Sequence, residues 1–146
     1  MANQSNHVYR VNILAATLVS ASFLFCNAPA SASGDAVRGK QKFKATCEVC
    51  HLAMDNAARN DELIKIGPNL FGVVGRPAGT YKGFRYSQAM KASGITWTEE
   101  VLGKYIEAPQ KMVPSVRMTF QGVSNPQDID DIVAYLATLG PTTLTN

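Results

Sequence analysis

The sequence predicts a small all-α fold in which helices are joined by loops rich in glycine and proline. Stretches near the start and the end of the mature chain carry the caps and stop signals of helices, and the rest is typical of loops rather than strands. The chain has 146 residues, of which 46% are hydrophobic and 17% charged. This length and composition suit one compact core and are too small for two.

The N-terminal segment differs from the rest and predicts a secretory signal peptide. Residues 13–25 are almost all apolar or small, Arg10 precedes them, and alanines and serines follow over 28–33. We expect a signal peptide over residues 1–32, cleaved between 30 and 33, and a mature domain over 33–146. The mature protein is then expected to be periplasmic without a membrane span, because the apolar run is short for an anchor. An uncleaved anchor is the alternative.

The first and last helices have the clearest signals. Asp35 is a candidate N-cap, and the helix after it runs through Phe43 into a cysteine motif, with Gly39 indicating a close helix crossing. Asn125 is the candidate N-cap of the last helix, which Gly140 and the following proline end. The apolar residues of this helix recur on one face: Ile129, Ile132, Val133, Leu136 and Leu139.

Two further helices are expected between these. A short helix is expected over 87–92 and a longer one over 98–107, with Pro109 ending it. Loops are expected over 66–83 and 109–125. Such loops can hardly form a self-sufficient core, so a large apolar cofactor in the middle of the domain is physically reasonable.

Two cysteines and a histidine form the most specific motif of the chain. The signal peptide takes Cys26 with it, so the remaining cysteines are Cys47 and Cys50, and His51 follows directly. This spacing is the attachment pattern of c-type haem, in which each thiol adds to one vinyl group and the imidazole becomes an axial ligand. The motif therefore predicts one haem c, covalently bound through two thioethers.

Three other interpretations of the motif are weaker. A redox-active dithiol normally follows a strand, whereas a helix is expected before these residues. A structural zinc site needs four ligands, and no second pair completes the set once the signal peptide is removed. A disulfide between Cys47 and Cys50 would close too small a loop to stabilise the fold much.

The sixth ligand of the iron is open among four methionines, because the mature chain has no second histidine. The candidates are Met54, Met90, Met112 and Met118. A lone methionine is more often a packing residue than a ligand. Met118 follows Pro114 in a loop, where no helix directs its side chain elsewhere, which favours it only slightly.

The order of the motifs resembles the class I c-type cytochromes, in particular the mitochondrial cytochrome c type and its soluble bacterial periplasmic relatives. The resemblance extends from Gly34 to Leu139. In that family a proline, a methionine four residues later and a phenylalanine two residues after that mark the axial methionine, as Pro114, Met118 and Phe120 do here. Other matching stretches are Gly67-Pro68-Asn69-Leu70, Gly83-Phe84-Arg85-Tyr86, Gly94-Ile95-Thr96-Trp97 and Ile132-Val133-Ala134-Tyr135-Leu136.

The resemblance implies a small cytochrome c fold wrapped around one haem, and it implies a role for each site residue. His51 and Met118 would be the axial ligands of the iron, and the carbonyl of Pro68 would accept the second ring N–H of His51. Tyr105 would lie near the sulfur of Met118. Arg76, Tyr86, Ser87 and Trp97 would reach the haem propionates. Leu70, Ile106, Phe120 and Leu136 would line the haem faces.

Departures from the family pattern concern one loop, the surroundings of Tyr105 and the charged rim. The segment 52–65 is longer than in the mitochondrial type and is expected as a surface loop or an extra helical turn. Val116 replaces a common threonine and Met90 a common asparagine, so hydrogen bonding near Tyr105 is expected to differ.

Basic residues expected around the haem edge are Lys42, Lys65, Lys111 and Arg117. The acidic cluster expected elsewhere is Asp128, Asp130 and Asp131, and neutral residues replacing other basic ones are Thr46, Gln110, Ser124 and Asn125.

Together these features predict a monohaem one-electron carrier that is not an enzyme, because histidine and thioether ligands leave no open position on the iron. The alternative is a haem catalyst or ligand sensor with a labile sixth ligand. The expected partners are redox proteins that dock at the exposed haem edge: a quinol-oxidising complex, an oxidase, a reaction centre or a dehydrogenase of a respiratory or photosynthetic chain. A net charge of +3 without a basic stripe argues against nucleic-acid binding, and a monomer is expected.

Overall fold

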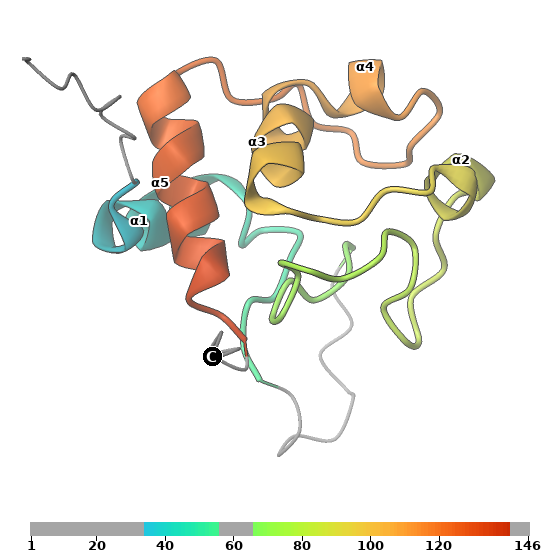
Figure 1. Cartoon of the computed structure of the whole chain (residues 1–146), viewed down its shortest axis with the longest axis horizontal. Helices are drawn as coiled ribbons and strands as arrows, with labels where there is room; N and C mark the ends of the chain where they lie inside the picture. The colour runs from blue at the N-terminus through green and yellow to red at the C-terminus, as the bar shows by residue number, and fades with distance from the viewer. Residues whose placement is uncertain (1–33, 56–65, 141–146) are drawn as a thin grey trace, which may run out of the picture. The chain divides into compact units, whose positions relative to one another are not determined.

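The computed structural model describes residues 34–55 and 66–140, and these residues form a helical domain (Figure 1). Its helices are α1 (Ala36–Thr46), α2 (Gln88–Ala92), α3 (Glu99–Glu107), α4 (Pro109–Met112) and α5 (Pro126–Ala137). Within the described ranges the strand-like structure is one isolated antiparallel bridge, between Pro77 and Thr96. The predicted all-α fold is therefore confirmed. Among the described residues, no helix is long and apolar enough to cross a membrane.

The predicted caps of the first and last helices are present. The Asp35 carboxylate accepts hydrogen bonds from the backbone N–H groups of Val37 at 2.8 Å and Arg38 at 3.1 Å. The Asn125 side chain accepts from the N–H of Gln127 at 2.9 Å, and a proline occupies the first helical position. The last helix ends at Ala137, three residues before the predicted stop. The predicted signal peptide over 1–32 lies outside the described residues.

The middle of the chain holds one helix that the sequence did not predict. Helices α2 and α3 follow the predicted ranges, with Ser87 and Thr98 as side-chain N-caps. The stretch 109–125, predicted as a loop, begins instead with α4. Pro109 ends α3, as predicted, but it also starts the next helix, because a proline fits the first turn, where its missing N–H has no helical partner.

Helix α5 packs against both α1 and α3 (Figure 1). The contact with α1 is close at Gly39, where an added Cβ would overlap the carbonyl oxygen of Asp131. Phe43 of α1 and Ile132 of α5 are each 1% exposed, and the Phe43 ring lies 5.4 Å from that of Tyr135, centre to centre. The predicted helix crossing at Gly39 is therefore confirmed.

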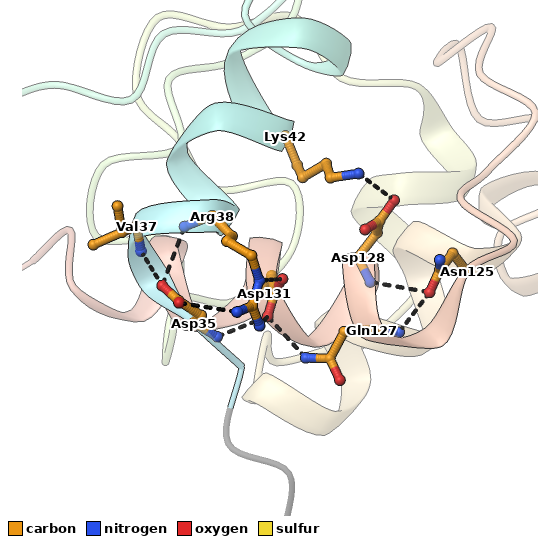
Figure 2. A network of polar contacts seen from close by, with 8 residues as sticks. All are labelled: Asp35, Val37, Arg38, Lys42, Asn125, Gln127, Asp128 and Asp131. Atoms are coloured by element: carbon orange, nitrogen blue, oxygen red, sulfur yellow. Dashed lines mark hydrogen bonds and ion pairs between the residues drawn. The ribbon is translucent and has the colours of Figure 1, made fainter.

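A polar network joins the start of α1 to α5 (Figure 2). The carboxylate of Asp131, which is 1% exposed, accepts from the backbone N–H of Asp35 at 2.7 Å and from Nε and Nη2 of Arg38 at 2.8 and 3.0 Å. Gln127 donates a further hydrogen bond at 2.9 Å. The side-chain hydrogen bond from Arg38 is the main cause that holds the pKa of Asp131 well below its usual range. The network thus holds a charged carboxylate between the two helices.

One charged contact contradicts the sequence prediction. Lys42 was predicted for the basic rim, away from the acidic cluster, but its Nζ lies 2.9 Å from Oδ2 of Asp128 (Figure 2). The crossing of α1 and α5 brings the two side chains together, although they are far apart in sequence. Lys42 therefore belongs to the contact between α1 and α5.

Backbone hydrogen bonds between two loops position Arg76 and Trp97, two of the residues predicted for the site. The N–H of Gly75 donates to the carbonyl of Trp97 at 2.8 Å, and the N–H of Trp97 donates to that of Arg76 at 3.0 Å. A third bond joins Ala78 to Ile95 at 2.8 Å. These bonds hold Arg76 and Trp97 side by side. Of the long segment 52–65, residues 52–55 are not helical, and 56–65 lie outside the described residues.

Candidate haem-binding site

A cavity of about 310 Å³ lies in the middle of the described domain, and its lining is mostly apolar. Its volume is at the lower end of the range of small-molecule sites. Helices α1, α2, α3 and α5 contribute side chains, for example Phe43, Met90 and Tyr105, and the loops supply the others. Every residue predicted for the site lines this cavity: Cys47, Cys50, His51, Pro68, Leu70, Arg76, Tyr86, Ser87, Trp97, Tyr105, Met118 and Phe120.

The end of α1 presents the cysteine motif to the cavity. The N–H of Cys47 donates to the carbonyl of Phe43 at 2.7 Å, and the N–H groups of Cys50 and His51 donate to the carbonyl of Cys47 at 3.0 and 2.9 Å. This turn places both thiols on the cavity wall, and they are not joined in a disulfide. Burial raises the pKa of the Cys47 thiol to about 11. Two free thiols beside a cavity fit covalent attachment of a cofactor.

The imidazole of His51 is buried and held by the loop that follows. Its Nδ1 donates to the carbonyl of Pro68 at 2.8 Å, because a carbonyl oxygen can only accept. An added Cβ at Gly67 would overlap the ring of His51, so the glycine leaves the space that the imidazole fills. Burial lowers the pKa of His51, which favours the neutral ring. With Nδ1 occupied, Nε2 is the nitrogen that can bind a metal.

The cavity distinguishes among the four candidate methionines. Of these four, Met90 and Met118 are among the described residues that line it, whereas Met54 is a partly exposed side chain elsewhere. The Sδ of Met118 lies 3.6 Å from Oη of Tyr105, which donates a hydrogen bond to it. Burial raises the pKa of Tyr105 to about 12, so this phenol keeps its proton at neutral pH. The geometry therefore favours a cavity-facing thioether at Met118 or Met90.

One part of the lining suits carboxylates. Arg76 donates to the carbonyls of Phe71 at 3.2 Å and Asn69 at 3.0 Å, and no carboxylate within the described ranges forms an ion pair with it. Burial lowers the pKa of Arg76, although a guanidinium stays charged in proteins. The indole N–H of Trp97 also has no acceptor in the part of the chain that the structure describes. A half-buried cation and a spare donor fit the propionates of a haem.

The mouth of the cavity was not predicted correctly from the sequence. Its exposed lining includes the apolar side chains of Val49 (71% exposed) and Ile66 (80% exposed) and the guanidinium groups of Arg85 and Arg117. Of these, only Arg117 was expected at the rim. Val49 could have been found, because it stands inside the attachment motif, but Arg85 and Ile66 reach the cavity only through the path of their loops. We call these four residues the mouth.

Comparison with known proteins gives matches over most of the described chain. The family model for cytochrome c matches residues 36–140. A cytochrome c2 from Rhodopila globiformis is 50% identical over 106 residues, which are 73% of this chain and 94% of that protein. A cytochrome c2 from Rhodomicrobium vannielii is 46% identical over 115 residues, covering 79% of this chain and 87% of that one.

A solved structure is similar as well. Cytochrome cH from Methylobacterium extorquens superposes with a TM-score of 0.62 at 42% sequence identity. The match covers 72% of this chain and 99% of that chain. The sequence comparisons and the fold comparison therefore indicate the same group of proteins.

Proposed function

The chain belongs to the cytochrome c family, and from this premise we propose that His51 and Met118 are the axial ligands of its haem iron. As a member of the family it is a one-electron carrier with one haem c, attached covalently at Cys47 and Cys50. The bound haem supplies the redox couple. The observation that carries the ligand assignment is that the histidine and a hydrogen-bonded thioether line one cavity.

The surrounding side chains hold the two ligands in their binding forms. The carbonyl of Pro68 keeps the proton of His51 on Nδ1 and fixes the ring, which leaves Nε2 for the metal. The O–H of Tyr105 draws on one lone pair of the Met118 sulfur and leaves the other free. Burial of both rings keeps water away from the site. These contacts support a fixed pair of ligands, through which the protein can tune the reduction potential of the haem.

The remaining site residues would neutralise or cover the rest of the cofactor. We assign Arg76, Tyr86, Ser87 and Trp97 to the propionates, since these residues line the cavity with donors. The hydroxyl of Ser87 already accepts from the N–H of Met90 at 3.2 Å, but its own proton remains available for a carboxylate. Leu70 and Phe120 add apolar surface. The apolar lining favours a flat apolar ring system over a polar metabolite.

Electron transfer without catalysis is the activity that this ligand set supports. Two strong ligands leave no position on the iron for a substrate or dioxygen. A haem catalyst or ligand sensor would instead need a sixth ligand that leaves easily. The hydrogen bond from Tyr105 to Met118 argues against such a labile ligand.

The partners we propose are redox proteins that dock on the mouth. The exposed apolar groups of Val49 and Ile66 line the same cavity as the cations of Arg85 and Arg117, a combination that suits a small, weakly bound interface. A partner with an acidic face would complement it. Quinol-oxidising complexes, oxidases, reaction centres and dehydrogenases remain the candidate classes.

We also propose that the protein works after export, with residues 1–32 as its signal peptide. Gly34 packs against the carbonyl of Asp130, so the folded domain begins directly after the proposed cleavage region. N-terminal sequencing of the periplasmic protein is expected to start between residues 31 and 34. A start at residue 2 in a membrane fraction would show that the segment is an anchor.

The visible spectrum of the ferric holoprotein tests the ligand assignment. Coordination of iron by sulfur gives a weak charge-transfer band in the far red, and we expect Met118→Ala to abolish it. Met90→Leu is the matched control, because Met90 lines the same cavity, and Met54→Leu and Met112→Leu control for methionines outside that lining. All three controls are expected to keep the band. Loss of the band in Met90→Leu with retention in Met118→Ala would reverse the assignment.

A further inference from the structure

Resting on the proposed role of Met118, we propose that Gln110 is a positioning residue that holds the Met118 loop, residues 113–122, in its ligating conformation. Gln110 lies in α4. Its Nε2 donates to the carbonyl of Met118 at 2.7 Å and to the carbonyl of Val116 at 3.2 Å. One side-chain amide therefore joins two carbonyls of the loop, one of them on the proposed ligand itself.

The loop has few other restraints near Met118. A backbone hydrogen bond closes its start, from the N–H of Val116 to the carbonyl of Val113 at 3.1 Å. Another follows its end, from the N–H of Val123 to the carbonyl of Ile106 at 3.0 Å. Between these bonds, residues 117–122 make no backbone-to-backbone hydrogen bond with any described residue. Gln110 is therefore the hydrogen-bonding partner of the Met118 backbone in the described chain.

The backbone that carries Gln110 is held firmly in place. Pro109, which precedes Gln110, is among the most deeply buried residues of the domain, and it fixes the backbone from which the amide extends. On the loop side, Ser115 has a φ of 66°, in the left-handed region that a residue with a Cβ rarely adopts. This turn brings residues 116–118 back toward α4. Gln110 thus joins a helix that the buried Pro109 anchors to a loop that turns tightly at Ser115.

The contact between Gln110 and the Met118 loop affects how readily an external ligand can take the place of Met118. Detachment of the Met118 sulfur requires the loop to move, and movement breaks both hydrogen bonds of Gln110. An external ligand binds only the open form, so its apparent affinity is reduced by the fraction of molecules that are open. Removal of the amide is expected to raise that fraction. Because the bonds are exposed to solvent, the increase should be about two- to tenfold.

Imidazole binding to the ferric holoprotein at one fixed pH tests the proposal. We expect Gln110→Leu to bind imidazole about two- to tenfold more tightly than the parent protein. The rate at saturating imidazole, which reports detachment of the sulfur, should rise as well. Gln110→Glu, which keeps the shape but replaces the donor by an acceptor, should show at least the same increase. Gln121→Leu is the matched control, since Gln121 is an exposed glutamine of the same loop.

The outcomes separate this proposal from the ligand assignment. If Gln110→Leu binds imidazole with the parent's affinity and limiting rate, Gln110 does not position the loop. An equal increase in Gln121→Leu, or a fall in Tm that accounts for the increase, also overturns it, because either shows a general loosening. Retention of the far-red band in Met118→Ala contradicts the ligand assignment instead, whatever the result at Gln110.

Discussion

At the scale of single residues, Asp131 shows how a buried carboxylate makes the stability of the fold depend on pH. Donors from Arg38, Gln127 and the backbone of Asp35 surround its carboxylate and lower its pKa. The unfolded chain has a carboxyl pKa of about 3.9, so in acid the unfolded state binds the proton more readily. The stability that this group contributes is complete above about pH 4 and is lost as the pH falls through the folded-state pKa.

Asp131→Asn should therefore be less stable than the parent at pH 7, with Tm lower by roughly 5–10 °C, and should lose less stability on acidification. Thermal unfolding followed by circular dichroism from pH 7 to pH 2 measures both effects. Asp130→Asn is the matched control, because that side chain is exposed and takes no part in the hydrogen bonds of Asp131. Parallel pH profiles for the parent protein and Asp131→Asn would contradict the assigned role.

At the scale of elements, replacing either of two helical glycines by alanine should change the stability of the fold, but in opposite directions. Gly39 lies where α1 meets α5, and an added Cβ would overlap the carbonyl oxygen of Asp131. Gly103 lies within α3, where an added Cβ would be 3.5 Å from Cγ2 of Ile129, an ordinary contact. Gly39→Ala should therefore destabilise the fold by about 1–3 kcal/mol or more. Gly103→Ala should stabilise it by about 0.5–1 kcal/mol, because alanine loses less entropy in a helix.

Denaturant unfolding of the two variants beside the parent measures these free energies. The pair is its own control, since both changes add one methyl group to a glycine inside a helix. Effects of the same sign and size would mean that helix propensity, rather than the packing of α1 on α5, determines the outcome.

The elements also show which features are readable in a sequence. Caps are local, because Asp35, Ser87, Thr98 and Asn125 contact N–H groups only two or three residues away. The attachment motif is local for the same reason. Helix α4 was missed because a proline after a helix was interpreted only as its end, although the same residue also fits a first turn.

The features that the sequence left open or missed depend on tertiary structure. Met90 was one of four candidate methionines and a departure from the family pattern, and only the packing of its helix brings the side chain into the lining. Lys42 and Asp128 form an ion pair because two distant helices cross, which no local pattern shows. For Gln110 the sequence indicated the loss of a basic residue, while its hydrogen bonds to the loop required coordinates. Sequence reasoning therefore predicted the contacts of Pro68 with His51 and of Tyr105 with Met118, which the structure shows, but not the hydrogen bonds of Gln110 or three of the four residues of the mouth.

At the scale of the whole molecule, the charge at the mouth should set the rate of encounter with charged reactants. Arg117→Glu is expected to slow oxidation of the ferrous protein by ferricyanide, an anion, and to speed oxidation by a cationic cobalt(III) complex. Both effects should fade as salt rises from 0.01 M to 0.1 M, because the Debye length falls from about 30 Å to about 10 Å. Stopped-flow rates over this salt range measure them.

Lys104→Glu is the matched control for this experiment. It changes the net charge by the same amount, on the exposed face of α3 where Lys104 pairs with Glu100. Its rates should stay closer to those of the parent protein with both oxidants. Equal effects of the two substitutions would mean that net charge, and not the mouth, governs the encounter.

The packing of α1 against α5 also bears on when the molecule is assembled. The two helices stand at opposite ends of the described chain, and in the proposed export, which starts at the N-terminus, α5 is the last described helix to emerge. Until then α1 lacks the helix that covers it, and the cavity lacks the wall that Ile132 and Leu136 provide. The Cys47 and Cys50 thiols, which the finished fold partly buries, are open during this interval. The distance between the two helices along the chain thus favours an order in which attachment of the haem precedes closure of the domain around it.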